Sequence, residues 1–474
     1  MDHFIYFVVS GHDDVEIALE KENDMNLKGK KIVVVGAGRS GIAVSRFCAQ
    51  KGACVQLNDR RNFGEFEGPW ADLKNLGIDL KGGGHLSEEL ANADLIVLSP
   101  GVPGSLPEFT RAKNNNVPIM GELELASRFN RAPLIAVTGT NGKSTTTTLV
   151  HHLLQAGGKK AGMAGNIGIP LIELVETREN YEVIVIEVSS FQLETIEELH
   201  PVIALILNIS EDHLDRYDSF QDYCLAKARL FMNQTREDYL VFNKEDKIVS
   251  DMIVSAQGIS IPFSSEAELA QGIYYKGSQI VYNRADHLPE GYDLSDVKLK
   301  GLHNIENMMA AIVAARIFSV SPQDIQKGLN SFVGLEHRLE WVREHNGVSY
   351  YNDSKATNVH AVIMSLRGFQ DHEVLLIAGG YDKGGSYETL KPWLKKKVKR
   401  LFLVGKAQKK MKLAFEGVVP TECVETIDRA LKEAQPHSRR GDSVVLSPAC
   451  ASFDQFKNFE ERGRFFKECV CHLQ

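Results

Sequence analysis

Residues 136–146 read Ala-Val-Thr-Gly-Thr-Asn-Gly-Lys-Ser-Thr-Thr and follow the apolar residues Leu134 and Ile135. An apolar strand that turns through glycines into a helix starting at Lys-Ser is typical of a phosphate-binding loop. Gly139 and Gly142 allow the backbone to bend, so that successive N–H groups point at phosphate oxygens and the helix directs its positive N-terminal end at the same anion. The segment predicts a strand, a turn and a helix that together bind nucleotide phosphates.

The loop departs from the usual spacing G-x-x-x-x-G-K-[ST], because Val137 stands where the first glycine belongs and the glycine comes two residues later. Lys143 is expected to contact the β- and γ-phosphates, and Ser144 to bind Mg²⁺. The alternative is a capped helix N-terminus followed by an ordinary surface lysine, but the apolar strand before the turn favours the phosphate loop. The expected ATP contacts are Gly139, Thr140, Asn141, Gly142, Lys143, Ser144 and Thr145.

Length and composition indicate a multidomain globular enzyme. The chain has 474 residues, of which 43% are hydrophobic and 24% charged, and its length suits about three domains. The formal net charge of -8 and the absence of a dominant basic stripe argue against nucleic acid as a partner. We interpret the short basic run at residues 395–400 as covering one helix face.

The seven cysteines include no C-x-x-C pair, so neither a disulfide framework nor a zinc site is predicted. The apolar patch at residues 4–9 is too short to span a bilayer and lacks a basic leader. We therefore expect a cytoplasmic, monomeric protein with no membrane partner. Residues 1–24 form an uncertain extension, and the start residue is left open between Met1 and Met25.

The order of apolar runs predicts three consecutive α/β domains with mainly parallel sheets. The domains are expected at residues 25–131, 132–334 and 335–474, with Rossmann-like first and last domains around a central ATPase of the phosphate-loop type. Expected strands begin after Lys31 and lie at residues 54–57, 95–98, 183–188, 202–207, 374–378, 400–404 and 443–446.

A second glycine motif, Gly36-Ala-Gly-Arg-Ser-Gly41, follows the first strand, and Asp59 lies where an acidic residue meets a ribose 2′-OH in dinucleotide-binding proteins. Taken alone, the motif indicates NAD. Arg60 and Arg61 suit an anionic ligand, and a separate ATP loop follows in the next domain. We assign the turn to a diphosphate-containing substrate, with a redox dinucleotide or a ligand-free scaffold as alternatives.

Two further polar segments follow expected strands. Glu187 ends an apolar run, where a carboxylate can help to hold Mg²⁺. Residues 211–217 read Glu-Asp-His-Leu-Asp-Arg-Tyr and also follow a strand, which favours a site over a solvated loop.

At this point the chain from about Lys30 onward resembles the Mur ligases, which are ATP-dependent amide ligases. The matching stretches are Gly139-Thr-Asn-Gly-Lys-Ser-Thr145, Gly165-Asn-Ile-Gly168, Glu187-Val-Ser-Ser-Phe-Gln-Leu-Glu194, Glu211-Asp-His-Leu-Asp-Arg-Tyr217, His303-Asn304, Glu336-His-Arg338, Asn352-Asp-Ser-Lys-Ala-Thr-Asn358 and Ser447-Pro-Ala-Cys-Ala-Ser-Phe-Asp-Gln-Phe-Lys-Asn-Phe-Glu460. The resemblance implies ligation of D-glutamate to UDP-N-acetylmuramoyl-L-alanine through an acyl phosphate, with ATP and two Mg²⁺ ions. Other members of the family, a folylpolyglutamate synthase and a non-enzymatic nucleotide-binding scaffold are the alternatives.

The resemblance also implies residue roles. Lys143, His213 and Lys227 are the expected catalytic residues; Ser144 and Glu187 would bind one Mg²⁺, and His213 a second with a carbamylated Lys227. An ordinary solvated helix lysine is the alternative for Lys227. The remaining expected contacts are Asn304 and Asn307 with adenine, Arg338 and Asp353 with phosphate and ribose, Lys355 with the γ-phosphate, Thr357, Lys383, Ser452 and Phe459 with D-glutamate, and Arg39, Ser40, Asp59, Arg60, Arg61 and Asn166 with the sugar nucleotide.

One position departs from the family pattern. Tyr381 stands where an acidic residue is expected after Gly379-Gly380, and Asp382 is shifted by one residue. The contacts around Lys383 are therefore left open.

Overall fold

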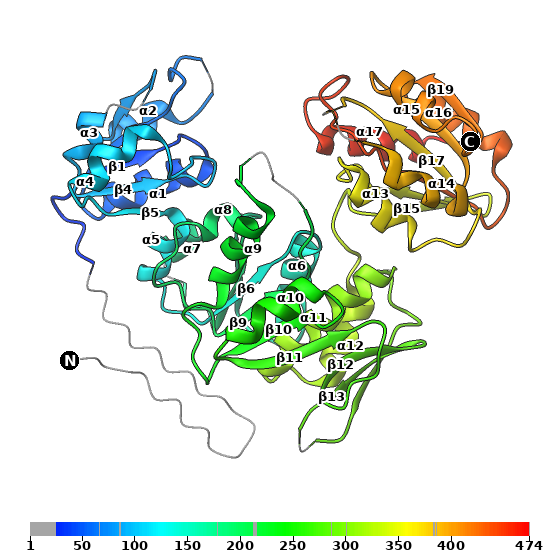
Figure 1. Cartoon of the computed structure of the whole chain (residues 1–474), viewed down its shortest axis with the longest axis horizontal. Helices are drawn as coiled ribbons and strands as arrows, with labels where there is room; N and C mark the ends of the chain where they lie inside the picture. Colours follow the sequence, from blue (N-terminus) through cyan, green and yellow to red (C-terminus); the bar gives the residue numbers. More distant parts are fainter. Residues whose placement is uncertain are drawn as a thin grey trace. The chain divides into compact units, whose positions relative to one another are not determined.

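The computed structural model describes residues 25–65, 67–84, 87–177, 179–211, 216–285, 287–299, 301–382, 384 and 386–473. Within the described residues the chain forms two compact units, one spanning 25–295 and 306–329 and the other spanning 296–305 and 330–473. The first unit holds two sheets and the second holds one (Figure 1). The predicted fold class, three α/β domains with mainly parallel sheets, is confirmed, and the exact domain limits stay a prediction.

The first sheet is fully parallel, with the strand order β3-β2-β1-β4-β5. Strands β2 and β3 are added on one side of β1, and β4 and β5 on the other, so the strand order reverses between β1 and β4. The glycine turn follows β1 at this switch point, which is where open α/β sheets bind ligands. The elements are β1 Lys31–Val35, α1 Arg39–Gln50, β2 Cys54–Asn58, α2 Trp70–Asn75, β3 Asp79–Lys81, α3 Ser87–Ala91, β4 Leu95–Leu98, η1 Pro107–Phe109, α4 Thr110–Asn114, β5 Ile119–Gly121 and α5 Glu122–Phe129.

The central sheet has nine strands in the order β14-β13-β12-β11-β10-β9-β6-β8-β7. Strand β6 lies between β9 and β8 and is buried at all five residues, so the loop after it opens from the middle of the sheet. Only the β12-β13-β14 edge is antiparallel. The elements are β6 Leu134–Thr138, α6 Lys143–Ala156, β7 Ala161–Gly165, α7 Leu171–Glu176, β8 Val183–Glu187, α8 Ser190–Leu193, β9 Ile203–Ile206, α9 Phe220–Ala228, η2 Arg229–Phe231, β10 Tyr239–Asn243, α10 Lys247–Met252, η3 Ile253–Ser255, β11 Ile259–Ser264, β12 Gly272–Lys276, β13 Gln279–Asn283, β14 Glu290–Asp293, α11 Leu302–Ile317 and α12 Pro322–Ser331.

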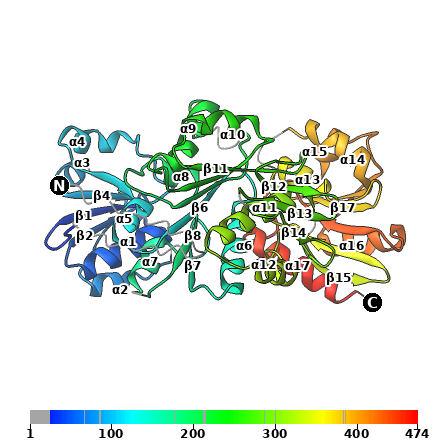
Figure 2. The ribbon, with the colours of Figure 1, turned by 90° about the horizontal axis from the view of Figure 1, so that it is seen from below.

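The third sheet has the order β15-β16-β20-β17-β18-β19, with only β15 antiparallel to its neighbour. Apolar residues of α13, α14 and α15 form one core layer, and those of α16 and α17 form the layer on the opposite face (Figure 2). The elements are β15 Glu340–His345, β16 Val348–Asn352, α13 Val359–Leu366, β17 Val374–Gly379, η4 Glu388–Leu390, α14 Lys391–Lys397, β18 Val398–Val404, α15 Gln408–Ala414, β19 Thr421–Glu425, α16 Ile427–Ala434, η5 Gln435–His437, β20 Ser443–Leu446 and α17 Phe459–Cys471. In the described part of the chain, every helix is too short or too polar to cross a bilayer.

Helix α5 joins the first two sheets through a buried carboxylate. The Glu124 side chain is completely buried and accepts hydrogen bonds from the backbone N–H groups of residues 197–199, at 2.9 to 3.2 Å. Arg128, one helical turn further along, donates to the same carboxylate at 2.9 Å. Charge-assisted hydrogen bonds to a fully paired buried anion fix relative position strongly. The bonded residues 197–199 follow shortly after the segment 187–194, so α5 holds the chain just beyond that segment.

The neighbouring carboxyl group of Glu122 is less well satisfied. Its Oε1 accepts from the Ile172 backbone N–H at 2.9 Å, at the start of α7, while Oε2 is buried without a hydrogen-bond partner. Burial raises the pKa of Glu122 to about 7, with the negative charge of Glu173 adding to the effect. The group is therefore neutral in mildly acidic solution and costs folding energy when it ionises.

We expect Glu122→Gln to change the pH dependence of stability. Because the folded pKa of about 7 lies above the unfolded value, the contribution of Glu122 is fully present below about pH 4.5 and is lost as the pH rises toward 7. Gln imitates the neutral acid, so the variant should gain about 1–3 kcal/mol relative to the parent between pH 5 and pH 8. Urea unfolding midpoints across this range measure the difference. Parallel pH profiles for the two proteins would contradict the prediction.

Candidate active site

The phosphate loop has the backbone shape that its glycines predict. It leaves β6 at Thr138, passes Gly139 at φ 154° and reaches Gly142 at φ 83°, the left-handed N-cap of α6. Lys143 folds back over the loop, and its Nζ donates to the carbonyl oxygens of Gly139 and Thr140, each at 2.8 Å. Ser144 is buried on the first turn of α6. The loop thus places a lysine and a helix N-terminus around one small volume, as phosphate binding requires.

Helix α11 closes one side of this loop. The Thr146 hydroxyl donates to Asn307 Oδ1 at 3.1 Å, and a Cβ added at Gly142 would overlap the same oxygen. Asn304 is also buried on α11. Gly142 is therefore required for two reasons, a left-handed φ and the close approach of Asn307.

Glu187 ends β8 and is buried next to Asn166, which follows β7. The Asn166 side-chain amide donates to Glu187 Oε1 at 2.7 Å, and the Asn166 backbone N–H donates to the Glu187 carbonyl oxygen at 2.9 Å. Glu187 Oε2 is buried without a hydrogen-bond partner. A buried, half-satisfied carboxylate has the chemistry of a ligand for a hard divalent cation, so Glu187 fits the expected Mg²⁺ role.

Lys227 lies under the phosphate loop rather than in solvent. Its side chain is only 1% exposed, and Nζ donates to the Gly139 carbonyl oxygen at 2.9 Å. The ammonium also lies 4.7 Å from the ring centroid of Tyr223, whose hydroxyl is 3.0 Å from Thr140 Oγ1. The alternative of a solvated helix lysine is therefore wrong. Tyr223 is a loop contact that the sequence did not reveal, because an aromatic residue inside a helix carries no signal for such a role.

His213 and Lys383 lie outside the described residues. The segment that follows His213 is tied to the segment after Glu187: Arg216 donates to the Glu194 carboxylate at 2.8 Å, and its guanidinium lies 4.4 Å from the Phe191 ring centroid. Both partners belong to the 187–194 stretch. Arg216 thereby joins the described end of the 211–217 segment to the 187–194 stretch.

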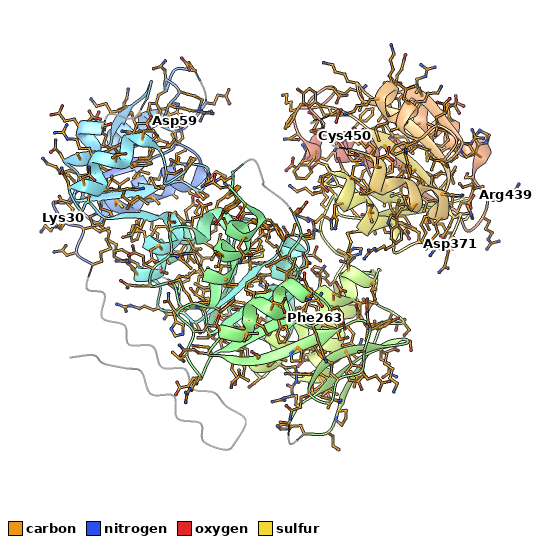
Figure 3. The ribbon with its side chains drawn as sticks, viewed as in Figure 1. Lys30, Asp59, Phe263, Asp371, Arg439 and Cys450 are labelled. Carbon is orange, nitrogen blue, oxygen red and sulfur yellow. The ribbon has the colours of Figure 1, made fainter. Side chains whose placement is uncertain are left out.

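Asp59, labelled in Figure 3, follows β2 and lies beside the glycine turn that follows β1. Asp59 accepts from the Ala37 backbone N–H at 2.9 Å and from the Arg61 backbone N–H and Nε at 3.0 and 3.1 Å. Burial disfavours its charge, but these hydrogen bonds outweigh burial and hold the pKa of Asp59 below its ordinary value. Arg39 donates to the Gly168 carbonyl oxygen at 2.5 Å, linking this turn to the Asn166 loop. Arg60 is exposed and Ser40 half-buried.

In the second unit, Asp353 points into the protein. Its carboxylate accepts from the hydroxyls of Ser365 and Ser447, both at 2.6 Å, and from the Leu339 backbone N–H at 3.1 Å. Burial raises the pKa of Asp353 to about 6. The bond to Leu339 fixes the backbone next to Arg338, which is half-buried.

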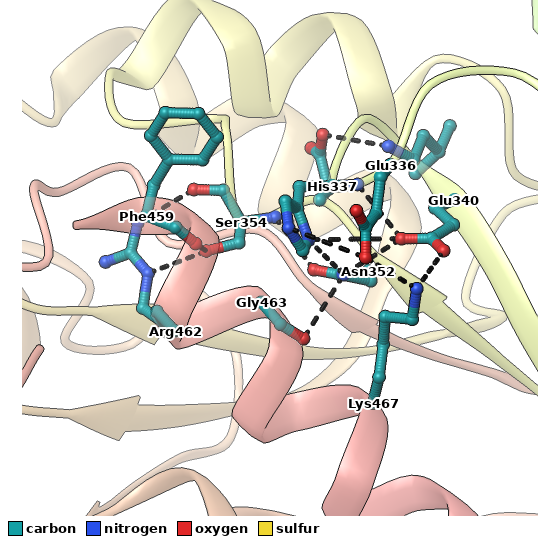
Figure 4. Close-up of polar contacts among 11 residues, drawn as sticks. Glu336, His337, Glu340, Asn352, Ser354, Phe459, Arg462, Gly463 and Lys467 are labelled. Carbon is teal, nitrogen blue, oxygen red and sulfur yellow. Dashed lines mark hydrogen bonds and ion pairs between the residues drawn. The ribbon is translucent and has the colours of Figure 1, made fainter.

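A buried arginine, Arg462, joins two loops of the second unit (Figure 4). Arg462 donates to the Ser354 hydroxyl and carbonyl oxygens at 2.9 and 2.8 Å, and to the carbonyl oxygens of residues 450 and 451 at 3.1 and 3.2 Å. Ser354 in turn donates to the Phe459 carbonyl oxygen at 2.8 Å. These bonds join the loops that contain Lys355, Thr357 and Ser452. The Lys355 ammonium lies 3.9 Å from the Phe459 ring centroid.

A group of potential metal ligands, Glu336, His337 and Glu340, lies nearby. The Lys467 ammonium already pairs with both carboxylates, at 2.9 and 2.6 Å (Figure 4). The Asn352 side-chain amide lies 2.8 Å from His337 Nδ1. A resident ammonium supplies the positive charge that a metal would bring, so this group is an ion-pair network.

Known protein families match this chain in three successive segments. Three family models match: "Mur ligase MurD-like, N-terminal domain" at residues 30–121, "Mur ligase middle domain" at 137–315 and "Mur ligase, glutamate ligase domain" at 337–450. The UDP-N-acetylmuramoylalanine--D-glutamate ligase of Geotalea uraniireducens is 44% identical over 449 residues, covering 95% of this chain and 99% of that protein. The chain belongs to the Mur ligase family.

Other Mur ligases agree with this assignment. The ligase of the same name from Geotalea daltonii is 43% identical over 446 residues, covering 94% of this chain and 98% of that protein. A solved pseudomurein peptide ligase type C from Methanothermus fervidus matches with a TM-score of 0.59 and 19% identity, covering 94% of this Mur ligase and all of that chain. The similarity to the Methanothermus fervidus structure concerns the fold alone.

We expect Gly142→Ala to abolish ATP binding by this Mur ligase, because a methyl group at that position would collide with Asn307 and push the loop off its path. Gly158→Ala is the matched control: Gly158 has φ 77°, and nothing lies within 4 Å of an added Cβ. The control should cost about 1 kcal/mol of stability from backbone strain and keep ATP affinity. Titration calorimetry with ATP measures both, and equal affinities in the two variants would contradict the prediction.

Proposed function

We propose that this Mur ligase joins D-glutamate to UDP-N-acetylmuramoyl-L-alanine in an ATP-dependent reaction of peptidoglycan precursor synthesis. The observation that carries the proposal is 44% identity, over nearly the whole of both chains, with a protein named UDP-N-acetylmuramoylalanine--D-glutamate ligase. We propose further that the chain works in the cytoplasm as a monomer. The seven cysteines support a reducing compartment, because all of them are free.

The proposed chemistry has two steps. The carboxylate of UDP-N-acetylmuramoyl-L-alanine attacks the γ-phosphorus of ATP, which forms an acyl phosphate and releases ADP. The amine of D-glutamate then attacks the acyl carbon, inorganic phosphate leaves, and the amine loses a proton as the amide forms. We assign the stabilisation of charge on the transferring phosphoryl group to Lys143 and the N-terminus of α6, and the folding of Lys143 back over the loop supports this assignment.

We propose that Ser144 and Glu187 hold one Mg²⁺, and that His213 and a carbamylated Lys227 hold a second. Bound Mg²⁺ would neutralise phosphate charge. The Lys227 ammonium first loses a proton; the neutral amine then bonds to the carbon of CO₂ and loses a second proton, so a cation becomes an anionic oxygen ligand. The burial of Lys227 beneath the phosphate loop supports this role, because an unmodified ammonium there must be desolvated.

The substrate contacts remain proposals of the same kind. Proximity supports several of them, since Arg39 reaches the Asn166 loop and Lys355 covers Phe459. The proposed groups are Arg39, Ser40, Asp59, Arg60, Arg61 and Asn166 for the sugar nucleotide, Asn304, Asn307, Arg338, Asp353 and Lys355 for ATP, and Thr357, Lys383, Ser452 and Phe459 for D-glutamate.

Substrate omission tests the proposed function. ADP formation should require ATP and UDP-N-acetylmuramoyl-L-alanine, and amide formation should additionally require D-glutamate. Replacing D-glutamate by L-lysine or L-alanine should abolish the amide product, because a lysine-containing site favours a dicarboxylic amino acid. Mass spectrometry of the products and an ADP assay give the two readouts. Equal product yield with L-lysine, or ADP formation without the sugar nucleotide, would overturn the proposal.

We expect Lys227→Ala to lose most turnover and to regain part of it with formate or acetate, which can supply the missing anionic oxygen. Lys397→Ala is the matched control, since Lys397 is also buried but pairs with Asp371 at 2.8 Å. Any turnover that Lys397→Ala loses should not be restored by formate or acetate. In the protein with its parent sequence, ¹³C-bicarbonate should give a carbamate NMR resonance, and this resonance should be absent from Lys227→Ala. A resonance that persists in Lys227→Ala would remove carbamylation from this position.

A further inference from the structure

Positive charge is concentrated in one segment of the third domain. Ten lysine and arginine residues and no acidic residue lie between Glu388 and Glu416, in a chain whose formal net charge is -8. The sequence interpretation was a single basic helix face at residues 395–400. The structure instead distributes these residues over helices α14 and α15, the strand β18 between them and the turn before α15.

The two helices cover the same face of the third sheet. They connect the neighbouring parallel strands β17, β18 and β19 in turn, and such crossovers share one hand and therefore one face. Leu394 of α14 and Met411 of α15 accordingly belong to one core cluster. The outward sides of α14 and α15 consequently form one surface, which presents Lys395, Lys396, Lys409, Lys412 and Leu413.

We call these five residues the cationic face. Other basic residues of the segment are neutralised by ion pairs: Lys391 with Glu388, Lys397 with Asp371, Lys399 with Asp442, Arg400 with Glu422 and Lys410 with Asp382. The four lysines of the cationic face are exposed, and no carboxylate of the described residues lies within ion-pair distance of them. Their charge is therefore not neutralised by ion pairs, although the pKa of Asp371, which is lowered mainly by the hydrogen bond from Lys397, is lowered further by the charge of Lys396.

The cationic face also contains apolar surface. Leu413 is 75% exposed between Lys412 and the end of α15. Trp393 is half-buried on α14, and the Arg367 guanidinium lies 5.1 Å from its ring centroid. Basic side chains around an exposed aliphatic group such as Leu413 are typical of surfaces that rest on anionic lipid, where lysines contact headgroups and apolar side chains enter the boundary with the acyl chains. Nucleic acid would use the lysines but has no use for Leu413.

We propose that the cationic face docks this Mur ligase reversibly on an anionic phospholipid surface. An anionic lipid surface is favoured because its charge complements that of the lysines and because its apolar layer can accept the Leu413 side chain. The contact is peripheral and weakens with salt, because it depends on a few lysines rather than on an inserted helix. The proposal departs from the sequence-based expectation of no membrane partner, which rested on the missing apolar span and the negative total charge.

Vesicle flotation tests the proposal with the full chain. Vesicles of phosphatidylcholine with phosphatidylglycerol should bind the protein, pure phosphatidylcholine should not, and binding should fall as salt rises. Changing Lys395, Lys396, Lys409 and Lys412 together to Glu should lower the partition coefficient by at least about tenfold. Leu413→Ala should lower it by roughly two- to fivefold while keeping the salt dependence.

The matched control changes four exposed lysines elsewhere, Lys28, Lys30, Lys74 and Lys247, to Glu, which alters net charge by the same amount. This variant should keep most of the vesicle binding. Equal losses in both quadruple variants, or equal binding to the two vesicle types, would overturn the proposal. A parallel titration with duplex DNA distinguishes nucleic acid from lipid as the ligand. Tighter binding to DNA than to vesicles, unaffected by Leu413→Ala, would assign the cationic face to nucleic acid instead. Thermal unfolding of each variant confirms that it is folded.

Discussion

The close packing around Gly139 and Gly142 is the constraint on which the central site depends. The loop between β6 and α6 is enclosed by α11 through Asn307 and by α9 through Lys227 and Tyr223. Because Gly142 adopts a left-handed φ directly beneath Asn307, there is no room for a side chain. The same compactness brings a buried lysine, Lys227, to a carbonyl oxygen of the loop.

Buried charged groups join segments at two junctions of the molecule, at Glu124 and at Arg462, and how completely a buried charge is satisfied differs between positions. Glu124 is paired with backbone amides and Arg128, and Arg462 is surrounded by carbonyl and hydroxyl oxygens. Such groups fix position because leaving any partner unpaired in the interior is costly. Glu122 and Glu187 differ, since each retains one oxygen without a partner. In Glu122 the result is a raised pKa, whereas in Glu187 the free oxygen suits a cation.

The net charge of the chain conceals its distribution. A total of -8 argues against polyanionic partners, yet α14 and α15 place unbalanced lysines on one face of the third sheet. Composition averages over the whole molecule, while attraction to a charged surface acts over about 10 Å and depends on the local arrangement. The exposed Leu413 distinguishes this face from an ordinary solvated one.

The sequence by itself determined the three α/β domains, the strand that leads into the phosphate loop and the family, because continuous apolar runs, turn glycines and ordered motifs are local properties of the chain. It also placed Glu187 at a strand end, where the structure has it. Only the tertiary structure decided that Lys227 is buried rather than solvated, that Glu122 and Glu124 brace the first two sheets, and that Arg462 joins two loops. These features join residues far apart in sequence, from Gly139 and Lys227 to Ser354 and Arg462. Burial and partner choice depend on which segments the fold brings together, so no local pattern records them.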